Sequence, residues 1–181
     1  PYIEMMPASE WVKAIMDEYP NFNIVGECWT RPAPAVAYWQ SGVKNYNGFD
    51  SHLKTVMDFP VEEAIRQALE TDGKGWGNGL TRVYDAVAMD YLYADVNNIM
   101  IMLGNHDMDR IADVVKDQDP LRVKLAYTLL ATMRGIPQVF YGDEYAMKSA
   151  DRKLGHSTLR MPLPQGKEVT PEMQDMFDYQ S

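Results

Sequence analysis

The sequence predicts an α/β fold built on parallel strands, and three observations support this prediction. Helical and strand-like patterns alternate along the chain, which is typical of parallel strands joined by crossover helices. The run from Ile99 to Leu103 is unbroken apolar, as expected of a strand buried on both faces of a parallel sheet. The 181 residues are 46% hydrophobic and 24% charged, a globular composition with enough chain for one ordinary domain.

The first half of the chain is expected to contain two strands and two helices. Ser9 is a suitable N-cap for a helix, which Pro20 ends. The segment 30–51 is rich in proline, glycine and aromatic residues and is expected to be a loop. Pro60 stands at the first position of the next helix, where no hydrogen bond is lost. The expected elements are a helix over 9–19, strands near 23–28 and 53–59, and a helix over 61–69.

The second half repeats the alternation after a glycine-rich loop. Asp119 is expected to cap a helix whose first turn contains Pro120, and Gly135 is expected to end it. The polar tail from Lys148 shows little periodicity. The expected elements are a helix over 80–94, a strand near 99–104, a helix over 119–133 and a strand near 138–142.

The charge balance narrows the class of partner. Lysine and arginine number 17 and aspartate and glutamate 26, a net charge of −9. Nucleic acid and anionic membrane are therefore not expected as partners, because both are negatively charged. The charge balance does not exclude a neutral sugar as the partner. No apolar run approaches the ~20 residues of a membrane span. The sequence has a single cysteine, Cys28, which excludes an intrachain disulfide. The sequence starts at Pro1 without a methionine, which predicts that it is a segment of a longer protein.

Each expected strand is followed by an acidic residue. Glu27 comes after 23–26 and Asp58 after 53–57, near the ends of the first two strands, while Asp107 comes after the third strand and Asp143-Glu144 after the fourth. Function in parallel β/α folds gathers at the carboxyl ends of the strands. Four such placements after four strands are more than surface solvation would be expected to produce.

A pair of carboxyl groups is the minimum machinery for cleaving a glycosidic bond. One of them must donate a proton to the leaving oxygen, which calls for a water-excluding environment. Glu27 suits this role because apolar Val25 and Trp29 flank it. Asp107 is suited to stabilising the positive charge of the transition state, and His106 to donating a hydrogen bond to a sugar hydroxyl.

The candidates also have structural alternatives. Glu27 alone could be a solvated strand-end glutamate, and His106 could be a core histidine. Asp58 is expected to be a structural hydrogen-bond partner, while Asp143-Glu144 fits a helix start and a sugar contact equally well. Two residues are placed at a rim and expected to be exposed as often as buried, namely Asp109 and Arg110. The three histidines show no ligand spacing, so a His/Asp metal site is not expected. Cleavage of a glycosidic bond by two carboxyl groups requires no cofactor, so none is expected.

Three ordered segments resemble the α-amylase family of retaining α-glucan hydrolases. They are NIVGECW (23–29), LGNHDMDR (103–110) and GIPQVFYGDE (135–144), and they correspond to barrel strands five, seven and eight of that family. The segments AYWQSG, VMDFPVEEAI, TLRMPLP and TPEMQDMFDY resemble its neopullulanase and cyclomaltodextrinase branch. The resemblance covers essentially the whole chain. It implies a partial (β/α)8 TIM barrel, roughly units five to eight, which is the C-terminal half of the catalytic barrel.

The resemblance also assigns roles to individual residues. Glu27 matches the general acid/base, Asp107 the aspartate that stabilises the transition state, His106 the sugar-binding histidine and Asn105 a supporting asparagine. The nucleophile of the family lies in a Gly-x-Arg-x-Asp motif, which this sequence lacks, and Pro1-Tyr2 resembles the stretch that follows it. A retaining mechanism needs the nucleophile roughly 5 Å from the acid/base. The segment alone is therefore expected to be inactive.

The implied activity is hydrolysis of α-1,4 glucosidic bonds, with α-1,6 bonds left open, in maltooligosaccharides, starch, pullulan or cyclodextrins. A transglycosidase of the same family and a non-catalytic carbohydrate-binding fragment remain as alternatives. Calcium is common in the family, but its usual ligands lie mostly in the other half of the barrel. Loop aromatics are expected to cover the barrel mouth or to stack on sugar, with Trp29, Tyr38 and Trp39 as substrate-binding candidates. Because a half-barrel leaves its outer strands with open edges, the isolated chain is expected to self-associate.

Overall fold

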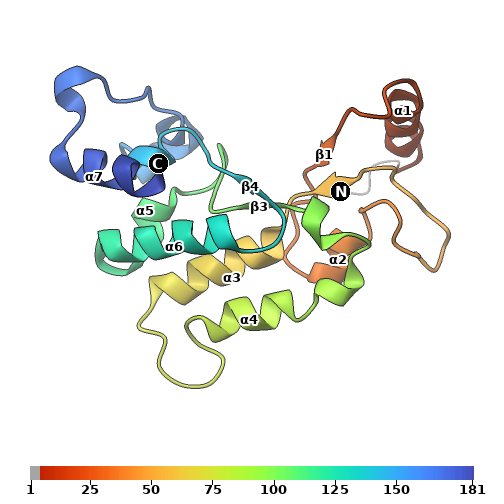
Figure 1. Ribbon diagram of the computed structural model, residues 1–181, viewed down its shortest axis with the longest axis horizontal. Coiled ribbons are helices and arrows are strands. Elements are labelled where there is room, and N and C mark those ends of the chain that lie inside the picture. The colour runs from red at the N-terminus through yellow and green to blue at the C-terminus, as the bar shows by residue number, and fades with distance from the viewer. Residues whose placement is uncertain (1–4) are drawn as a thin grey trace. The chain divides into compact units, whose positions relative to one another are not determined.

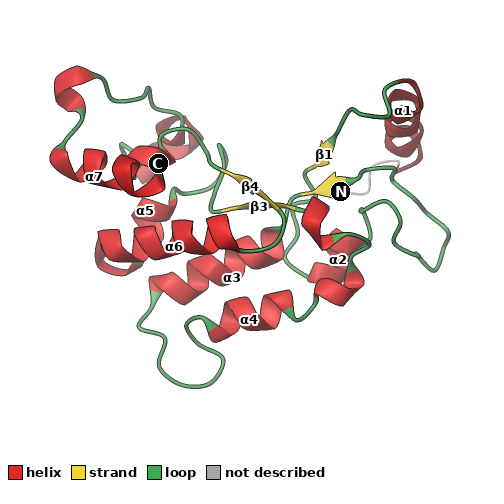
Figure 2. Ribbon diagram, viewed as in Figure 1, coloured by secondary structure: helices red, strands yellow, loops and turns green. Residues whose placement is uncertain are grey.

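The computed structural model describes residues 5–181, in which short strands alternate with helices and long loops (Figure 2). Pro1 and Tyr2, which resemble the stretch after the family nucleophile, lie outside the described residues. The chain forms two compact units. The first unit comprises the chain up to Val61 together with 85–101 and 134–136, and the second comprises 62–84, 102–133 and 137–181.

The elements follow one another along the chain as Figure 1 labels them. The α-helices are α1 (Met5–Glu18), α2 (Ala33–Ala37), α3 (Phe59–Glu70), α4 (Thr81–Val87), α5 (Ile111–Val114), α6 (Pro120–Thr132) and α7 (Pro171–Gln180). The strands are β1 (Val25–Gly26), β2 (Thr55–Val56), β3 (Met100–Met102) and β4 (Ile136–Gln138). Short 3-10 helices cover Asp90–Leu92, Val96–Asn98, Lys116–Gln118, Asp143–Tyr145, Arg152–Leu159 and Gly166–Glu168.

Parallel strand pairing, which the alternation predicts, is present in the first unit. Strand β1 pairs in parallel with β2, so that Val25 lies opposite Thr55. A further parallel bridge joins Met57 to Met100. The prediction of an α/β fold with parallel strands is therefore confirmed.

An apolar core lies against this pairing, and the expected long loop contributes to it. Gln40 is buried and ties the loop to two other segments: its amide nitrogen donates to the carbonyls of Lys54 and Asp95, and its amide oxygen accepts from Ala94 and Asp95. The loop also contains the short helix α2. The buried members of this core are Ala33, Val36, Ala37, Val56, Tyr93 and Ile99.

Helix α6 is the main helix of the second unit, and it matches the helix expected over 119–133. Asp119 caps it by accepting the Leu121 N–H (2.9 Å), and Pro120 occupies the first turn. Helix α3 lies alongside α6 (Figure 1), and Arg122 on α6 donates to the Leu69 carbonyl near the end of α3 (3.1 Å). The buried face of α6 consists of Val123, Ala126, Tyr127 and Leu130.

The fourth strand lies earlier in the sequence than expected, at Ile136–Gln138 instead of 138–142. Gly135 has a φ of 100°, and a Cβ on it would lie only 2.6 Å from the Ile99 carbonyl oxygen. This close approach, which glycine permits, lets Ile136 donate its N–H to Ile99 (2.8 Å). Pairing therefore begins directly after the glycine.

Two helical boundaries also differ from the expectation. The helix expected over 80–94 ends at Val87, and Asp90 in the 3-10 helix that follows forms an ion pair with Arg134. The tail, which shows little periodicity in the sequence, contains α7. Thr170 caps this helix by accepting the Met173 N–H (3.3 Å). The helix packs through contacts with distant side chains, so its short amphipathic pattern was a weak signal in the sequence.

Candidate active site

Glu27 follows β1 in the first unit, at the carboxyl end of the strand, and its side chain is exposed. The expected apolar shielding is not found within this unit, since Val25 is 40% exposed and Trp29 is 52% exposed. Among the described residues β1 pairs along one edge only, with β2. Trp29 packs one ring face on Phe59 instead, with ring centroids 5.1 Å apart.

Asn105, His106 and Asp107 follow β3 and lie together in the second unit. The buried Asn105 accepts the Asp107 N–H through its side-chain Oδ1 (2.8 Å). Such an Asx turn fixes the local backbone. Asn105 thus supports the position of Asp107 through the main chain.

The Asp107 carboxylate has three side-chain partners. Its Oδ1 pairs with Nδ1 of His156 (2.9 Å) and accepts from Nη2 of Arg160, and its Oδ2 lies 3.2 Å from Nε2 of His106. The hydrogen bond from His156, reinforced by Arg160 and His106, lowers the pKa of Asp107. The group is therefore held as a carboxylate, the form that stabilises a developing positive charge.

His156 and Arg160 come from the tail, and no role was predicted for either of them. Together with Asp107 they belong to a small polar region, where a hollow of about 270 Å³ is lined in part by Asp107, Asp109 and His156. Arg160 stands in the segment TLRMPLP. This segment resembles the family, but nothing in its spacing indicates contact with Asp107.

Arg110, expected at a rim, is instead buried in the second unit. Its Nη1 donates to Oδ1 of Asp143 and to the Tyr141 carbonyl (both 2.9 Å), and its Nη2 donates to the Leu159 carbonyl (2.8 Å). Its guanidinium also lies 4.6 Å from the centroid of the Phe140 ring. Of the exposed and buried alternatives, the structure shows the buried one, because an opposite charge and carbonyls replace the water around the guanidinium.

Asp143 is a buried partner of Arg110, which favours its structural alternative over a sugar contact. Burial raises the pKa of Asp143 to about 6, and Arg110 opposes this shift. A carboxyl group with a raised folded-state pKa binds more protons in the folded state than in the unfolded state. Its contribution to stability is therefore complete at acidic pH and is lost as the pH rises through about 6.

Asp58 is a buried structural partner, as expected. Its Oδ1 accepts the Val61 N–H at the start of α3 (3.1 Å), and its Oδ2 accepts from Arg134, which also pairs with Asp90. Burial raises the pKa of Asp58, and Arg134 opposes the rise. The cluster joins three segments of the first unit.

The loop aromatics pack largely against one another in the first unit. Tyr38 stacks on Phe49 with ring centroids 5.2 Å apart, and Trp39 meets Phe49 edge-on while packing against the apolar core. Trp29 and Tyr46 are the more exposed members of the set. Within this unit, a stacking role for Trp39 is thus less favoured by its contacts than one for Trp29.

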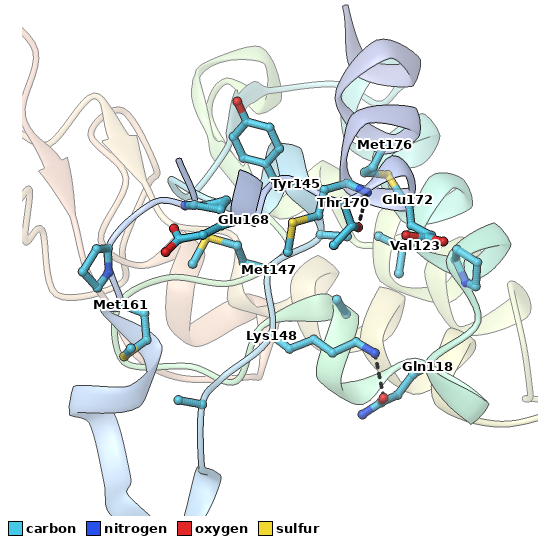
Figure 3. A pocket seen from close by; sticks show the side chains of 17 residues that line it. Gln118, Val123, Tyr145, Met147, Lys148, Met161, Glu168, Thr170, Glu172 and Met176 are labelled. Carbon is cyan, nitrogen blue, oxygen red and sulfur yellow. Dashed lines mark hydrogen bonds between the residues drawn. The ribbon is translucent and has the colours of Figure 1, made fainter. Parts of the chain in front are cut away.

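An apolar cavity of about 660 Å³ lies elsewhere in the second unit (Figure 3). Its lining does not include Asn105, His106 or Asp107, so it is separate from the candidate site. Lys148 at its border donates to Gln118 (2.7 Å). The apolar and aromatic side chains that line it include Val123, Tyr145, Met147, Met161, Met173 and Met176.

Residues 5–181 offer neither of two other kinds of site. In that range no group of three or more His, Cys, Asp or Glu side chains is placed to hold a metal ion. No helix in the same range is long and apolar enough to cross a membrane.

Comparison with known proteins shows the family. Residues 3–178 match the family model described as alpha amylase, catalytic domain. A cyclomaltodextrin glucanotransferase of Geobacillus stearothermophilus is 27% identical over 142 residues, covering 76% of this chain and 18% of the relative. A 4-alpha-glucanotransferase of Thermotoga neapolitana is 32% identical over 93 residues, covering 51% of this chain and 20% of the relative. The chain thus spans about a fifth of the length of these relatives.

A solved structure shows the same fold. The cyclic alpha-maltosyl-(1→6)-maltose hydrolase of Arthrobacter globiformis, in complex with maltose, aligns with a TM-score of 0.77. The alignment covers 99% of this chain and 37% of that one at 22% identity. At this identity the likeness concerns the fold alone.

Proposed function

The chain belongs to the alpha-amylase catalytic-domain family and forms part of its (β/α)8 barrel, and from this premise we propose that the protein carrying it cleaves α-1,4 glucosidic bonds of maltooligosaccharides, starch, pullulan or cyclodextrins with retention of configuration. Cleavage of α-1,6 bonds is a second proposed specificity, as in a neopullulanase. The single observation that carries the proposal is the Asp107 carboxylate, which is fixed by the Asn105 turn and by three charged or chargeable partners.

The proposed mechanism gives each carboxyl group one task. Glu27 donates its proton to the leaving glycosidic oxygen while an aspartate outside these 181 residues forms a bond to the anomeric carbon. Asp107 stabilises the positive charge that develops on the ring, and His106 donates to a sugar hydroxyl. Glu27 then removes a proton from water, which attacks the anomeric carbon and releases the aspartate. Two inversions at this carbon amount to retention.

The second candidate function is transfer of the glycosyl group to a sugar hydroxyl instead of to water. The names of the two sequence relatives above, both glucanotransferases, favour it. A protein that joins this segment to the missing half of the barrel should release α-anomers from maltooligosaccharides, which proton NMR detects before mutarotation. Chromatography of the products separates hydrolysis from transfer, because only transfer yields oligosaccharides longer than the substrate.

The 181-residue polypeptide alone should release no product in the same assay, because the family nucleophile motif is not in its sequence. Initial release of β-anomers would exclude retention. Release of sugar by the isolated polypeptide would show that its own residues complete the reaction, and it would contradict the assigned mechanism.

We further propose that the isolated chain pairs with a second copy through the first unit. Trp11, Tyr19 and Phe22 are each more than half exposed and border an apolar hollow together with Ile15 and Ile24. Exposed apolar surface of this kind marks an interaction site, and among the described residues β1 is paired with a strand along one edge only.

Sedimentation velocity over a range of concentrations tests this pairing. The wild-type chain should show a concentration-dependent dimer, and Trp11→Glu should shift it towards monomer. Trp76→Glu is the matched control, because Trp76 is fully exposed in the second unit and lies outside this hollow. A wild-type chain that stays monomeric at every concentration would refute the proposal.

A further inference from the structure

We infer that Arg160 and His156 are positioning residues that hold the Asp107 carboxylate in one orientation for the reaction. This inference deepens the proposed function and rests on it. Neither residue touches the reacting atoms in the proposed mechanism. Both would act through Asp107.

Both carboxylate oxygens of Asp107 have side-chain partners. Arg160 and His156 both engage Oδ1 of Asp107, while His106 faces Oδ2. Partners on both oxygens oppose rotation of the carboxylate about its terminal torsion, which is otherwise broad and soft. The Asn105 turn fixes the backbone of the same residue. Backbone and side chain of Asp107 are therefore held separately.

The tail segment that carries Arg160 is itself anchored. Arg160 donates through Nε to the His106 carbonyl (3.1 Å) and through Nη2 to the Asp107 carboxylate, so it makes two hydrogen bonds to the same turn. The preceding residue, Leu159, is buried and its carbonyl accepts from the buried Arg110 (2.8 Å). An arginine that projects from an anchored backbone loses less conformational freedom when it pairs than one on a free tail.

The alternative to a positioning role is that Arg160 and His156 form ordinary surface ion pairs with Asp107. Arg160 and His156 are about half or more exposed, and isolated exposed pairs contribute little to stability. Positioning does not require a large stabilising energy, because a misplacement of ~1 Å at a reacting group costs about 10²-fold in rate. A positioning role and a surface pair therefore differ in their effect on turnover and on the Asp107 carboxyl, not in their effect on unfolding.

The direct test reads the Asp107 carboxyl itself by carbon-detected NMR titration of the 181-residue chain. Arg160→Gln and His156→Gln should each raise the Asp107 pKa towards its ordinary value. Lys153→Gln, which removes a positive charge from the same exposed segment without touching Asp107, should leave it unchanged. Circular dichroism confirms that each variant folds. An Asp107 pKa that does not respond to Arg160→Gln in a folded chain would overturn the inference.

The kinetic test uses the protein that carries these residues together with the rest of the barrel. Arg160→Gln should lower kcat about 10²-fold with KM little changed, and Arg160→Lys should restore part of the loss. An unchanged kcat would overturn the positioning role even where the pKa moved. Asp107→Asn distinguishes failure of the proposed function from failure of the positioning inference. Full activity of that variant would reject the proposed function. The titration of Asp107 does not depend on catalysis and so tests the positioning inference by itself.

Discussion

Replacing Glu27 by glutamine should lower the cleavage of maltooligosaccharides by about 10²- to 10⁴-fold in the protein that carries this segment. Glutamine preserves the shape of the side chain but cannot donate a proton to the leaving oxygen. It also cannot accept the proton of the attacking water. Both halves of the proposed reaction should therefore slow.

A maltosyl fluoride substrate sharpens this test, because fluoride departs with little help from an acid. The first step of Glu27→Gln should be nearly normal on the fluoride, and the glycosyl-enzyme should accumulate because its hydrolysis still needs the base. Glu18→Gln serves as the matched control, since Glu18 is an exposed glutamate at the end of α1. Activity of Glu27→Gln within twofold of wild type would remove Glu27 from the reaction.

Replacing Arg110 by methionine should destabilise the chain by about 3–5 kcal/mol, the usual loss when one partner of a buried ion pair is removed. Asp143 would remain buried without its cation, and the carbonyls of Tyr141 and Leu159 would lose their shared donor. Urea unfolding at fixed pH measures the difference, and Lys153→Met provides an exposed-cation control in the same unit.

The pH dependence gives this prediction a definite sign. Burial already raises the Asp143 pKa to about 6, and loss of Arg110 would raise it further. The variant should therefore be less destabilised at pH 5, where Asp143 can take up a proton, than at pH 8. Arg110→Met combined with Asp143→Leu should be more stable than Arg110→Met alone, because no buried charge remains. If Arg110→Met lost the same free energy of unfolding at pH 5 and at pH 8, the ion pair would not be the source of the effect.

Local sequence signals located the elements whose stabilising groups are close in the chain. The Asp119-Pro120 pair marked the start of α6, because both the cap and the first turn use neighbouring residues. The apolar run from Ile99 to Leu103 contains β3 and is almost wholly buried. Asn105, His106 and Asp107 lie together after β3, since consecutive residues at a strand end cannot separate.

The sequence by itself thus determined the parallel α/β class, the family resemblance and the choice of Glu27 and Asp107 as candidates. Only the tertiary structure decided that Arg110 is buried and that His156 and Arg160 contact Asp107. Arg110 and its partner Asp143 are 33 positions apart in the chain. His156 and Arg160 are 49 and 53 positions away from Asp107. Whether a charged side chain is solvated or buried depends on partners that folding brings from such distances. No periodicity or spacing near Arg110 records the partner that allows its burial.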